Sequence, residues 1–518
     1  MKIWGVGLPG ILVCLPVLVS AQSFTETALL FSRTKPGGSA RIQAMGGAQI
    51  SLGGDYSSAF SNPAGLGMYN RSEFSFSTGY NSGSSESSYL DNTTSDNQTN
   101  LHVPGVGLVF QNNQNRSKGF LSGTFAITFN RTNNFNQRFS YEGTNANNSI
   151  IDYFIADATG LLADEFLVGG DYFNTPTGLA YNNYLIEDST FLNPSASPYE
   201  YLSVLGTFPN NPNDIRTVFQ QEEVIFSGAQ NQWSFSYGAN LSDKFFIGAG
   251  VGLASIRYEV KKTYRESDFV FVLDPTFKPL NNLLLEEELK ITGSGFNGTL
   301  GMIYRPLDLL QVGISYTTPT YYQITDIYQG SMKTLWNNFD YFGDGDLLLD
   351  VNEQTDELIS EYDLRTPDRL SLGASFFFQK FGFVSADAEL VNYARAKYSS
   401  GISGISFDSD NENIQELYQT VVNYRIGGEF RFNVWRVRAG FSYMPDPFVS
   451  EQNGISRDIT SYSTGLGFRS KKFYADFALV FTQGENSYRP YRVNSPTSPL
   501  VTLDTKNTLG VLTIGFPF

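Results

Sequence analysis

The segment Arg436-Val437-Arg438-Ala439-Gly440-Phe441-Ser442-Tyr443 decides the fold class. In an extended chain its odd-numbered residues form one face and its even-numbered residues form the other. The odd-numbered face is apolar, and the even-numbered face carries two arginines, a glycine and a serine. A strand of about 9–11 residues with this alternation can cross a bilayer when it belongs to a closed barrel. The segment therefore predicts one strand of a transmembrane β-barrel.

The same two-residue period recurs along the chain. Short connections such as 242–244 and 470–472 alternate with longer ones, which is typical of barrels with short periplasmic turns and long extracellular loops. An even number of strands places both ends of the barrel in the periplasm. We predict an all-β, antiparallel, up-and-down barrel of about 14 strands over residues 72–518, with long loops at 131–231, 259–289 and 324–366. The strands are expected near residues 72–80, 103–111, 120–130, 232–241, 245–258, 290–304, 310–322, 368–379, 383–398, 421–432, 436–443, 459–469, 473–481 and 508–518.

Residues 1–21 have the features of a secretory signal peptide. Lys2 precedes an apolar run that ends in Val19-Ser20-Ala21, an Ala-x-Ala-like cleavage site. The only cysteine, Cys14, lies inside this segment, so the mature chain is expected to hold no thiol. Lipidation of Cys14 is the alternative, but Val13 is bulky for the preceding position and the apolar run continues past Cys14.

Composition separates a barrel from other classes of protein. After residue 21 no run of about 18 apolar residues could form a membrane-spanning helix. The 43 Phe, 30 Tyr and 49 Gly, with only 17% charged residues, suit aromatic girdles and tightly curved strands. The formal charge of −16 argues against a nucleic-acid partner, whose phosphates would be repelled.

The C-terminal segment alternates large apolar residues and ends in an aromatic one, Phe518. It is expected to close the barrel on the first strand. A final aromatic residue resembles the signal that the outer-membrane barrel assembly machinery reads. An edge strand of a soluble sandwich is the weaker alternative, because an exposed apolar edge promotes aggregation in water.

Residues 22–71 do not show the strand period. They are rich in Gly, Ala and Ser and contain Ala44-Met45-Gly46-Gly47-Ala48 and Asn62-Pro63-Ala64-Gly65-Leu66. Here the sequence resembles the FadL/TodX family of outer-membrane transporters of hydrophobic compounds. In that family a glycine-rich hatch with an Asn-Pro-Ala motif sits inside a fourteen-stranded barrel. The resemblance implies that Gly46, Gly47, Asn62, Pro63, Ala64 and Gly65 belong to such a hatch.

The resemblance continues in 364–367, 369–378, 424–430 and 438–443, which look like later strands of the family. It implies passive uptake of hydrophobic small molecules, such as long-chain fatty acids or hydrocarbons, across the outer membrane of a Gram-negative bacterium. The insertions 131–231 and 324–366 match no family motif and leave the substrate open. The alternative function is a docking or shuttle subunit that binds secreted proteins.

Successive side chains of a barrel strand face lipid and lumen in turn, and this alternation, which we call parity, predicts a group of charged side chains inside the barrel. One interpretation is an ion-pair network that fills the lumen and holds the hatch. The other is that surplus arginine captures a substrate carboxylate, which a planar guanidinium binds well. The group comprises Arg369, Asp387, Glu389, Arg425, Glu429, Arg431, Arg436 and Arg438.

The first insertion contains an apolar stripe at helical spacing, which predicts an amphipathic helix. The stripe could pack on neighbouring loops, or it could wall a groove where a hydrophobic substrate first lands. Its residues are Ile151, Phe154, Ile155, Leu161, Leu162 and Phe166.

Catalysis is not expected. His102 is the only histidine, and no phosphate-binding loop, zinc spacing or dinucleotide motif is present. The sequence therefore predicts no catalytic residue, no metal site and no cofactor. The expected partners are a hydrophobic substrate, the lipid of the outer membrane and the assembly machinery.

Overall fold

The computed structural model describes residues 24–518 except 115, 192, 204, 206–214, 272–275, 277 and 494–497. The predicted signal peptide, with Cys14 and its cleavage site, lies outside the described residues. The strands are β1 (Glu73–Tyr89), β2 (Asn92–Asn113), β3 (Phe120–Asn134), β4 (Gln137–Asn145), β5 (Glu187–Asp188), β6 (Tyr201–Leu202), β7 (Ile215–Leu241), β8 (Phe245–Phe271), β9 (Leu280–Leu307), β10 (Leu310–Thr317), β11 (Tyr321–Asp340), β12 (Leu347–Gln354), β13 (Leu358–Arg365), β14 (Arg369–Phe377), β15 (Gly382–Asn392), β16 (Lys397–Ser399), β17 (Thr420–Phe432), β18 (Trp435–Met444), β19 (Ile459–Arg469), β20 (Tyr474–Tyr488) and β21 (Val501–Pro517). The helices are α1 (Phe24–Ser32), α2 (Ala40–Gln43), α3 (Ser58–Ser61), η1 (Pro63–Met68), α4 (Ile150–Ala158), η2 (Ala163–Phe166), α5 (Pro176–Asn182), η3 (Tyr393–Arg395) and α6 (Asp408–Leu417).

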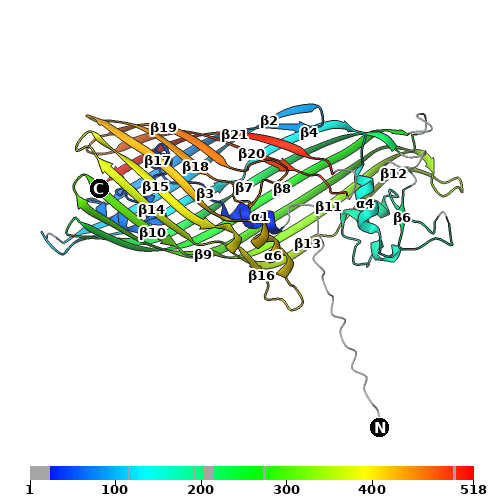
Figure 1. The fold of residues 1–518 in the computed structure, drawn as a ribbon, viewed down its shortest axis with the longest axis horizontal. Helices are drawn as coiled ribbons and strands as arrows, with labels where there is room; N and C mark the ends of the chain where they lie inside the picture. The colour runs from blue at the N-terminus through cyan, green and yellow to red at the C-terminus, as the bar shows by residue number, and fades with distance from the viewer. Residues whose placement is uncertain are drawn as a thin grey trace, which may run out of the picture.

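The strands close into an antiparallel barrel (Figure 1). β1 pairs with β2 on one side and with β21 on the other, so the last strand meets the first, as the alternating C-terminal segment predicts. β3 with β4, β10 with β11, β12 with β13 and β14, and β15 with β16 are successive pieces of single barrel strands. Counted in this way the barrel has fourteen strands, which confirms the predicted architecture.

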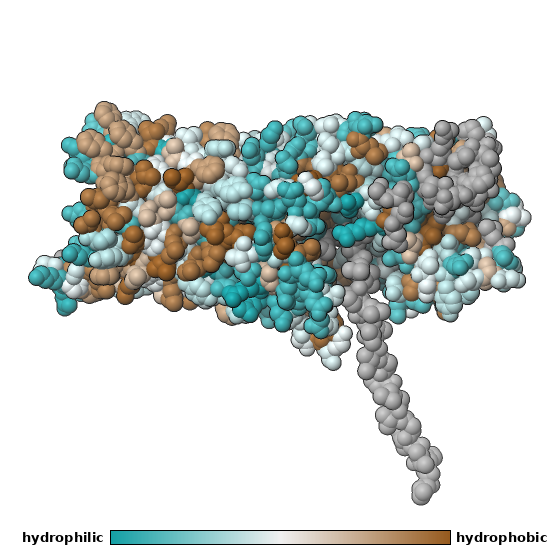
Figure 2. Space-filling model, in the orientation of Figure 1, coloured by the Kyte–Doolittle hydropathy of each residue, from teal (hydrophilic) through white to brown (hydrophobic). Residues whose placement is uncertain are grey.

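Outward-facing apolar side chains form a band around one end of the barrel. Figure 2 shows them gathered over the end that holds the C-terminus, across β14, β15 and β17. On β8 the outward residues are apolar up to Leu253, and then charged at Arg257, Glu259 and Lys261. Because charged side chains are costly within the hydrocarbon layer, the membrane ends near Leu253 on this strand.

The strands continue far beyond this band, and the predicted loops are therefore wrong in their extent. β7 and β8 are 27 residues long, and strands occupy much of the segments 131–231, 259–289 and 324–366. Outside the lipid the outer face of β8 is polar, and its inner face mixes Tyr258, Val260 and Tyr264 with Lys262 and Glu266. The alternation of apolar and polar residues fades there, and with it the signal by which a strand is recognised.

Two prolines divide neighbouring strands at the outer edge of the band. Pro319 separates β10 from β11, and Pro367 separates β13 from β14, because proline cannot donate a main-chain hydrogen bond to the ladder. Thr320 and Thr366 join the two strands again through N–H···O contacts of 3.0 Å. The predicted single strand 310–322 is therefore two pieces, and 383–398 is likewise divided by η3.

The wall is incomplete on one side above the band. β17, β18 and β19 have their outer ends at Thr420, Met444 and Ile459, and within the described residues β16 pairs with β13 alone. The helices α1 and α6 contact each other and lie at this gap (Figure 1). Among the described residues, none of the helices combines the length and the apolar character needed to span a membrane.

Candidate functional site

The segment that precedes β1 folds inside the lumen as a hatch, which we define as residues 24–72. Gly46 and Gly47 have φ values of +66° and +81°, a region that favours glycine. A Cβ on Gly46 would lie 2.6 Å from the carbonyl oxygen of Phe441 in β18. The N–H of Gly46 donates to Ser463 Oγ of β19 at 2.9 Å. Gly46 thus lets the hatch backbone lie directly on the barrel wall, and Gly47 leaves room for Pro36 within the hatch.

Asn62 joins the hatch to two barrel strands. Its side chain is fully buried, and its Oδ1 accepts from the N–H of Ala64 at 3.2 Å, so that it caps η1. Its Nδ2 donates to the carbonyl oxygen of Ile50 at 2.6 Å and lies 3.3 Å from that of Ile314 in β10 and 3.5 Å from that of Met302 in β9. Pro63 occupies the first position of η1. A main-chain N–H at this position would have no acceptor within the helix, so proline costs no hydrogen bond. The motif therefore acts as a tight, fully bonded turn.

A buried ion-pair network lies beneath the hatch. The side chain of Arg438 in β18 is inaccessible to solvent, and it donates to Glu429 Oε2 and to Asp476 Oδ1, each at 2.7 Å. Arg469 also donates to Asp476, at 2.8 Å. Arg41 of the hatch lies 3.6 Å from Glu429 Oε2. The network thus connects β17, β18, β19 and β20 with the hatch, and we call it the latch.

Two further contacts hold the hatch from β14 and β15. Asp387 Oδ2 accepts from the main-chain N–H groups of Gln49 and Ile50 at 2.6 and 3.0 Å. Arg369 donates to the carbonyl oxygen of Ser32, at the end of α1, at 2.6 Å. A carboxylate that accepts from two main-chain amides is well placed to fix a turn of the hatch.

All eight predicted charged residues point into the lumen, as parity requires. Arg425 donates to Glu389 Oε1 at 2.7 Å, and Arg431 donates to Glu429 Oε1 at the same distance. Arg436 differs, because its guanidinium donates to two carbonyl oxygens of its own turn, and it forms no ion pair within the described chain. The geometry supports the interpretation that these charges fill the lumen and hold the hatch.

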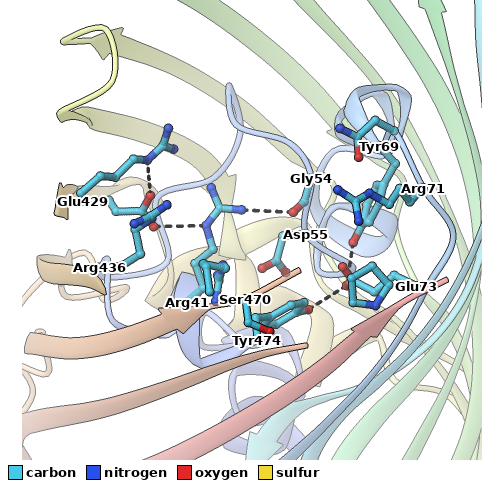
Figure 3. Close-up of a pocket in the computed structure, with 14 residues that line it drawn as sticks. Arg41, Gly54, Asp55, Tyr69, Arg71, Glu73, Glu429, Arg436, Ser470 and Tyr474 are labelled. Atoms are coloured by element: carbon cyan, nitrogen blue, oxygen red, sulfur yellow. Dashed lines mark hydrogen bonds and ion pairs between the residues drawn. The ribbon is translucent and has the colours of Figure 1, made fainter. Parts of the chain in front are cut away.

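A cavity of about 390 Å³ opens below the latch, at the end of the barrel that holds the C-terminus (Figure 3). Arg41 of the hatch lies between Glu429 and Gly54, and it donates to the carbonyl oxygen of Gly54 at 3.2 Å. On the other side of the cavity, Tyr474 donates to Glu73 Oε1 at 2.7 Å. The cavity therefore borders the latch at Arg41, Glu429 and Arg469, while Arg438 stays shielded from water.

The lumen around α1, the first helix of the hatch, is lined by aromatic residues and filled by this helix. The ring of Phe24 lies 5.0–5.3 Å from those of Tyr362, Tyr398 and Phe407, all in edge-on contacts. Phe31, at the other end of α1, is 1% exposed and packs on barrel residues of the same cluster. Edge-on ring pairs stabilise such packing beyond the apolar area that they bury. An apolar helix therefore occupies an apolar chamber.

The apolar stripe of the first insertion forms the core of an extracellular cap, which comprises α4, η2, α5 and the strand ends around them. Ile151, Phe154 and Phe166 are at most 1% exposed, Ile155 and Leu161 are half-buried, and Leu162 lies at the surface. Ile151, Phe154 and Phe166 share a cluster with Trp336 of β11. The structure favours the interpretation that this stripe packs on neighbouring segments, because its largest side chains face the inside of the cap.

A buried carboxylate makes the outer part of the barrel, below the cap, sensitive to pH. Burial raises the pKa of Glu222 to about 7 against the opposing effect of nearby Lys262, and Tyr141 and Tyr488 donate to it at 2.9 and 2.8 Å. Glu222 lies in β7 beyond the apolar band, level with the charged outer part of β8. The unfolded chain loses this proton near pH 4.5, well before the folded chain does. The stabilisation, on the order of 3 kcal/mol, is present below pH 4.5 and is lost as the pH rises through 7.

We therefore expect amides of β4, β7 and β8 around Glu222 to exchange hydrogen more readily at pH 8 than at pH 5, after correction for intrinsic exchange rates. Hydrogen exchange followed by mass spectrometry measures this. Glu222→Gln should remove most of the pH dependence, and an equal dependence in wild type and variant would contradict the assignment.

The sequence model of the outer membrane protein transport family (OMPP1/FadL/TodX) matches residues 222–508, which is more than half of the chain. The chain belongs to this family. The match favours a transport protein of the outer membrane over the docking alternative. No protein with a curated description matches the sequence.

Two solved structures show the fold of this FadL/TodX-family chain. A FadL homologue of Pseudomonas aeruginosa aligns with a TM-score of 0.52 at 13% identity, covering 94% of this chain and 99% of the other. The toluene transporter TodX of P. putida aligns with a TM-score of 0.50 at 13% identity, covering 93% and 99%. At this identity the likeness concerns the barrel and its hatch.

Three latch residues, Arg41, Arg469 and Asp476, were not among the predicted ones, and neither were Asp55, Glu73 and Tyr474 of the cavity. Arg41 and Asp55 are the only charged residues between Lys35 and Arg71, a signal that could have marked them. Arg469 and Asp476 lie on predicted strands and share the lumenal parity. Their pairing with Arg438 depends on the register between strands, which the alternation does not reveal.

Proposed function

We propose that the protein carries hydrophobic small molecules, such as long-chain fatty acids or hydrocarbons, across the outer membrane by passive uptake through its hatch-gated barrel. The family supports transport, and the toluene transporter TodX supports an apolar substrate. The observation that carries the proposal is the aromatic chamber around α1. A chamber that accepts an apolar helix offers the same environment to an apolar substrate.

In this mechanism the substrate takes the place of α1. Transfer from one apolar site to another keeps apolar surface out of water throughout, so no nucleotide is required. Displacement of α1 would open the gap between β16 and β17, since α1 and α6 lie in it. The substrate would then leave sideways through the wall, and the latch would return the hatch to its closed position.

A reversible cross-link tests whether the hatch must move. Ser51 Oγ of the hatch lies 2.6 Å from Ser375 Oγ of β14, and both side chains are buried. Cysteines at these positions are close enough to form a disulfide. We expect oxidised Ser51→Cys/Ser375→Cys protein to lose uptake of labelled fatty acid and of toluene, and a reductant to restore both.

The pair Ser375→Cys/Ser385→Cys is a matched control, because these hydroxyls are 2.9 Å apart and both belong to the barrel. Uptake of fatty acid and of toluene by this control protein should be the same before and after oxidation. Undiminished uptake by the oxidised hatch–barrel pair, with the disulfide verified by mass spectrometry, would refute the hatch-gated route.

A further inference from the structure

Five side chains form a continuous row across the outer face of the wall. Leu253 of β8 is in register with Phe296 of β9, which is in register with Tyr321 of β11. Tyr321 in turn is in register with Arg365 of β13, and Arg365 with Lys397 of β16. All five are exposed on the outside of the barrel. The row spans four strand spacings, roughly 19 Å, and changes from apolar to cationic along its length.

The row lines a groove of about 730 Å³. Its floor is made of flat groups in contact with one another. The rings of Phe296 and Tyr321 stack at 5.7 Å with an interplanar angle of 27°, and the guanidinium carbon of Arg365 lies 5.8 Å from the centre of the Tyr321 ring. The groove therefore offers an apolar platform that ends in a positive charge.

The groove lies at the outer edge of the apolar band. On β8, Val251 faces the lipid just before the groove residue Leu253, and Arg257 follows just after it. The two prolines that interrupt these strands are close to the groove in sequence, because Pro319 precedes Tyr321 and Pro367 follows Arg365. A ligand in this groove would hold its apolar part in the lipid and its polar part at the level of the head groups.

Arg365 and Lys397 are unbalanced charges. Like charges placed opposite each other on adjacent strands destabilise a sheet. Neither residue forms an ion pair with any part of the chain that the structure describes. Asp363 also lines the groove, but this single carboxylate lies within 4 Å of neither cation and cannot balance both. The arrangement calls for an anion from outside the chain.

We propose that this groove binds a phosphorylated lipid of the outer leaflet. The phosphate bridges Arg365 and Lys397, because it offers several acceptor oxygens and a charge that matches two cations. An acyl chain of the same lipid lies over Tyr321, Phe296 and Leu253. The five side chains of the row face the membrane and not the lumen, so the proposal stands whether or not the transport proposal is correct.

The experiment measures lipid binding to the purified mature protein by native mass spectrometry in detergent. The probe is diphosphoryl lipid A, compared with its dephosphorylated form, with palmitate and with inorganic phosphate. The test variant is Arg365→Gln/Lys397→Gln. The control variant is Arg265→Gln/Lys333→Gln, whose two exposed cations also face outward, on either side of Leu284, far beyond the apolar band.

We expect the test variant to bind lipid A at least tenfold more weakly, and the control variant to bind it like the wild type. Asp363→Asn should bind it more tightly, because the variant removes the one opposing charge. Equal weakening by both double variants would overturn the proposal. So would equal binding of the dephosphorylated lipid, tighter binding of palmitate, or displacement of lipid A by inorganic phosphate at equal concentration.

Discussion

Arg438→Gln is expected to lower the free energy of unfolding by about 3 kcal/mol. Glu429 and Asp476 are at most 3% exposed in their side chains, and each would lose its 2.7 Å contact with the guanidinium. Removing one partner of a buried ion pair leaves an uncompensated charge, which costs roughly 3–5 kcal/mol. We place the effect at the lower end, because Arg431 and Arg469 still contact the two carboxylates. Urea unfolding in lipid vesicles, followed by tryptophan fluorescence, measures it.

Arg436→Gln is the matched control for that prediction. Arg436 lies on the same strand and the same face, but it donates only to the carbonyl oxygens of Asn433 and Trp435. The control should change stability by less than about 1 kcal/mol. Equal effects of the two substitutions would show that the latch contributes no more than any lumenal arginine.

Gly440→Ala is expected to release the hatch while the barrel still closes. The side chain added at Gly440 would overlap the main-chain N of Gly46 and the carbonyl carbon of Met45. Gly427, which is in register with Gly440, likewise faces the main chain of Met45. Overpacking of this kind costs roughly 1–3 kcal/mol, and here neither backbone has room to yield. We expect a persistent ionic conductance in planar bilayers and cleavage of the hatch by added protease.

Gly428→Ala provides the control for the second prediction. Gly428 lies on the neighbouring strand with its face to the lipid, and an added Cβ would come no closer than 3.2 Å to Phe383. This variant should remain closed to ions and protected from protease. A closed, protected Gly440→Ala protein would mean that the hatch does not depend on close contact with β18.

Much of the barrel could be predicted because lipid imposes a two-residue period. The alternation around Arg436–Tyr443 and Leu512–Phe516 placed strands and assigned their faces, and fourteen segments led to fourteen barrel strands. The same reasoning failed for 259–271 and 324–340, where β8 and β11 continue outside the lipid. Outside the band the outward positions carry polar residues such as Lys261 and Thr263 instead of leucine. The lipid-facing apolar period therefore does not mark the strand there.

For the candidate site, the sequence predicted which side chains face the lumen, but it did not predict which groups they contact. Parity directed Asp387 and Glu429 into the lumen, and Asn62-Pro63-Ala64 marked the hatch. That Asp387 accepts from the hatch amides of Gln49 and Ile50 could not be predicted, because these residues lie outside any regular period. The apolar stripe shows the same limit, since helical spacing identified α4 without saying what its face would contact.

The sequence by itself determined that the chain forms a barrel and which side chains face lipid or lumen, because alternation is a local property of an extended backbone. Only the tertiary structure decided that Arg438 joins Glu429 to Asp476, that α1 fills the aromatic chamber, and that Arg365 and Lys397 lie side by side. Each of these arrangements depends on register and closure, which bring together residues whose separation along the chain carries no signal.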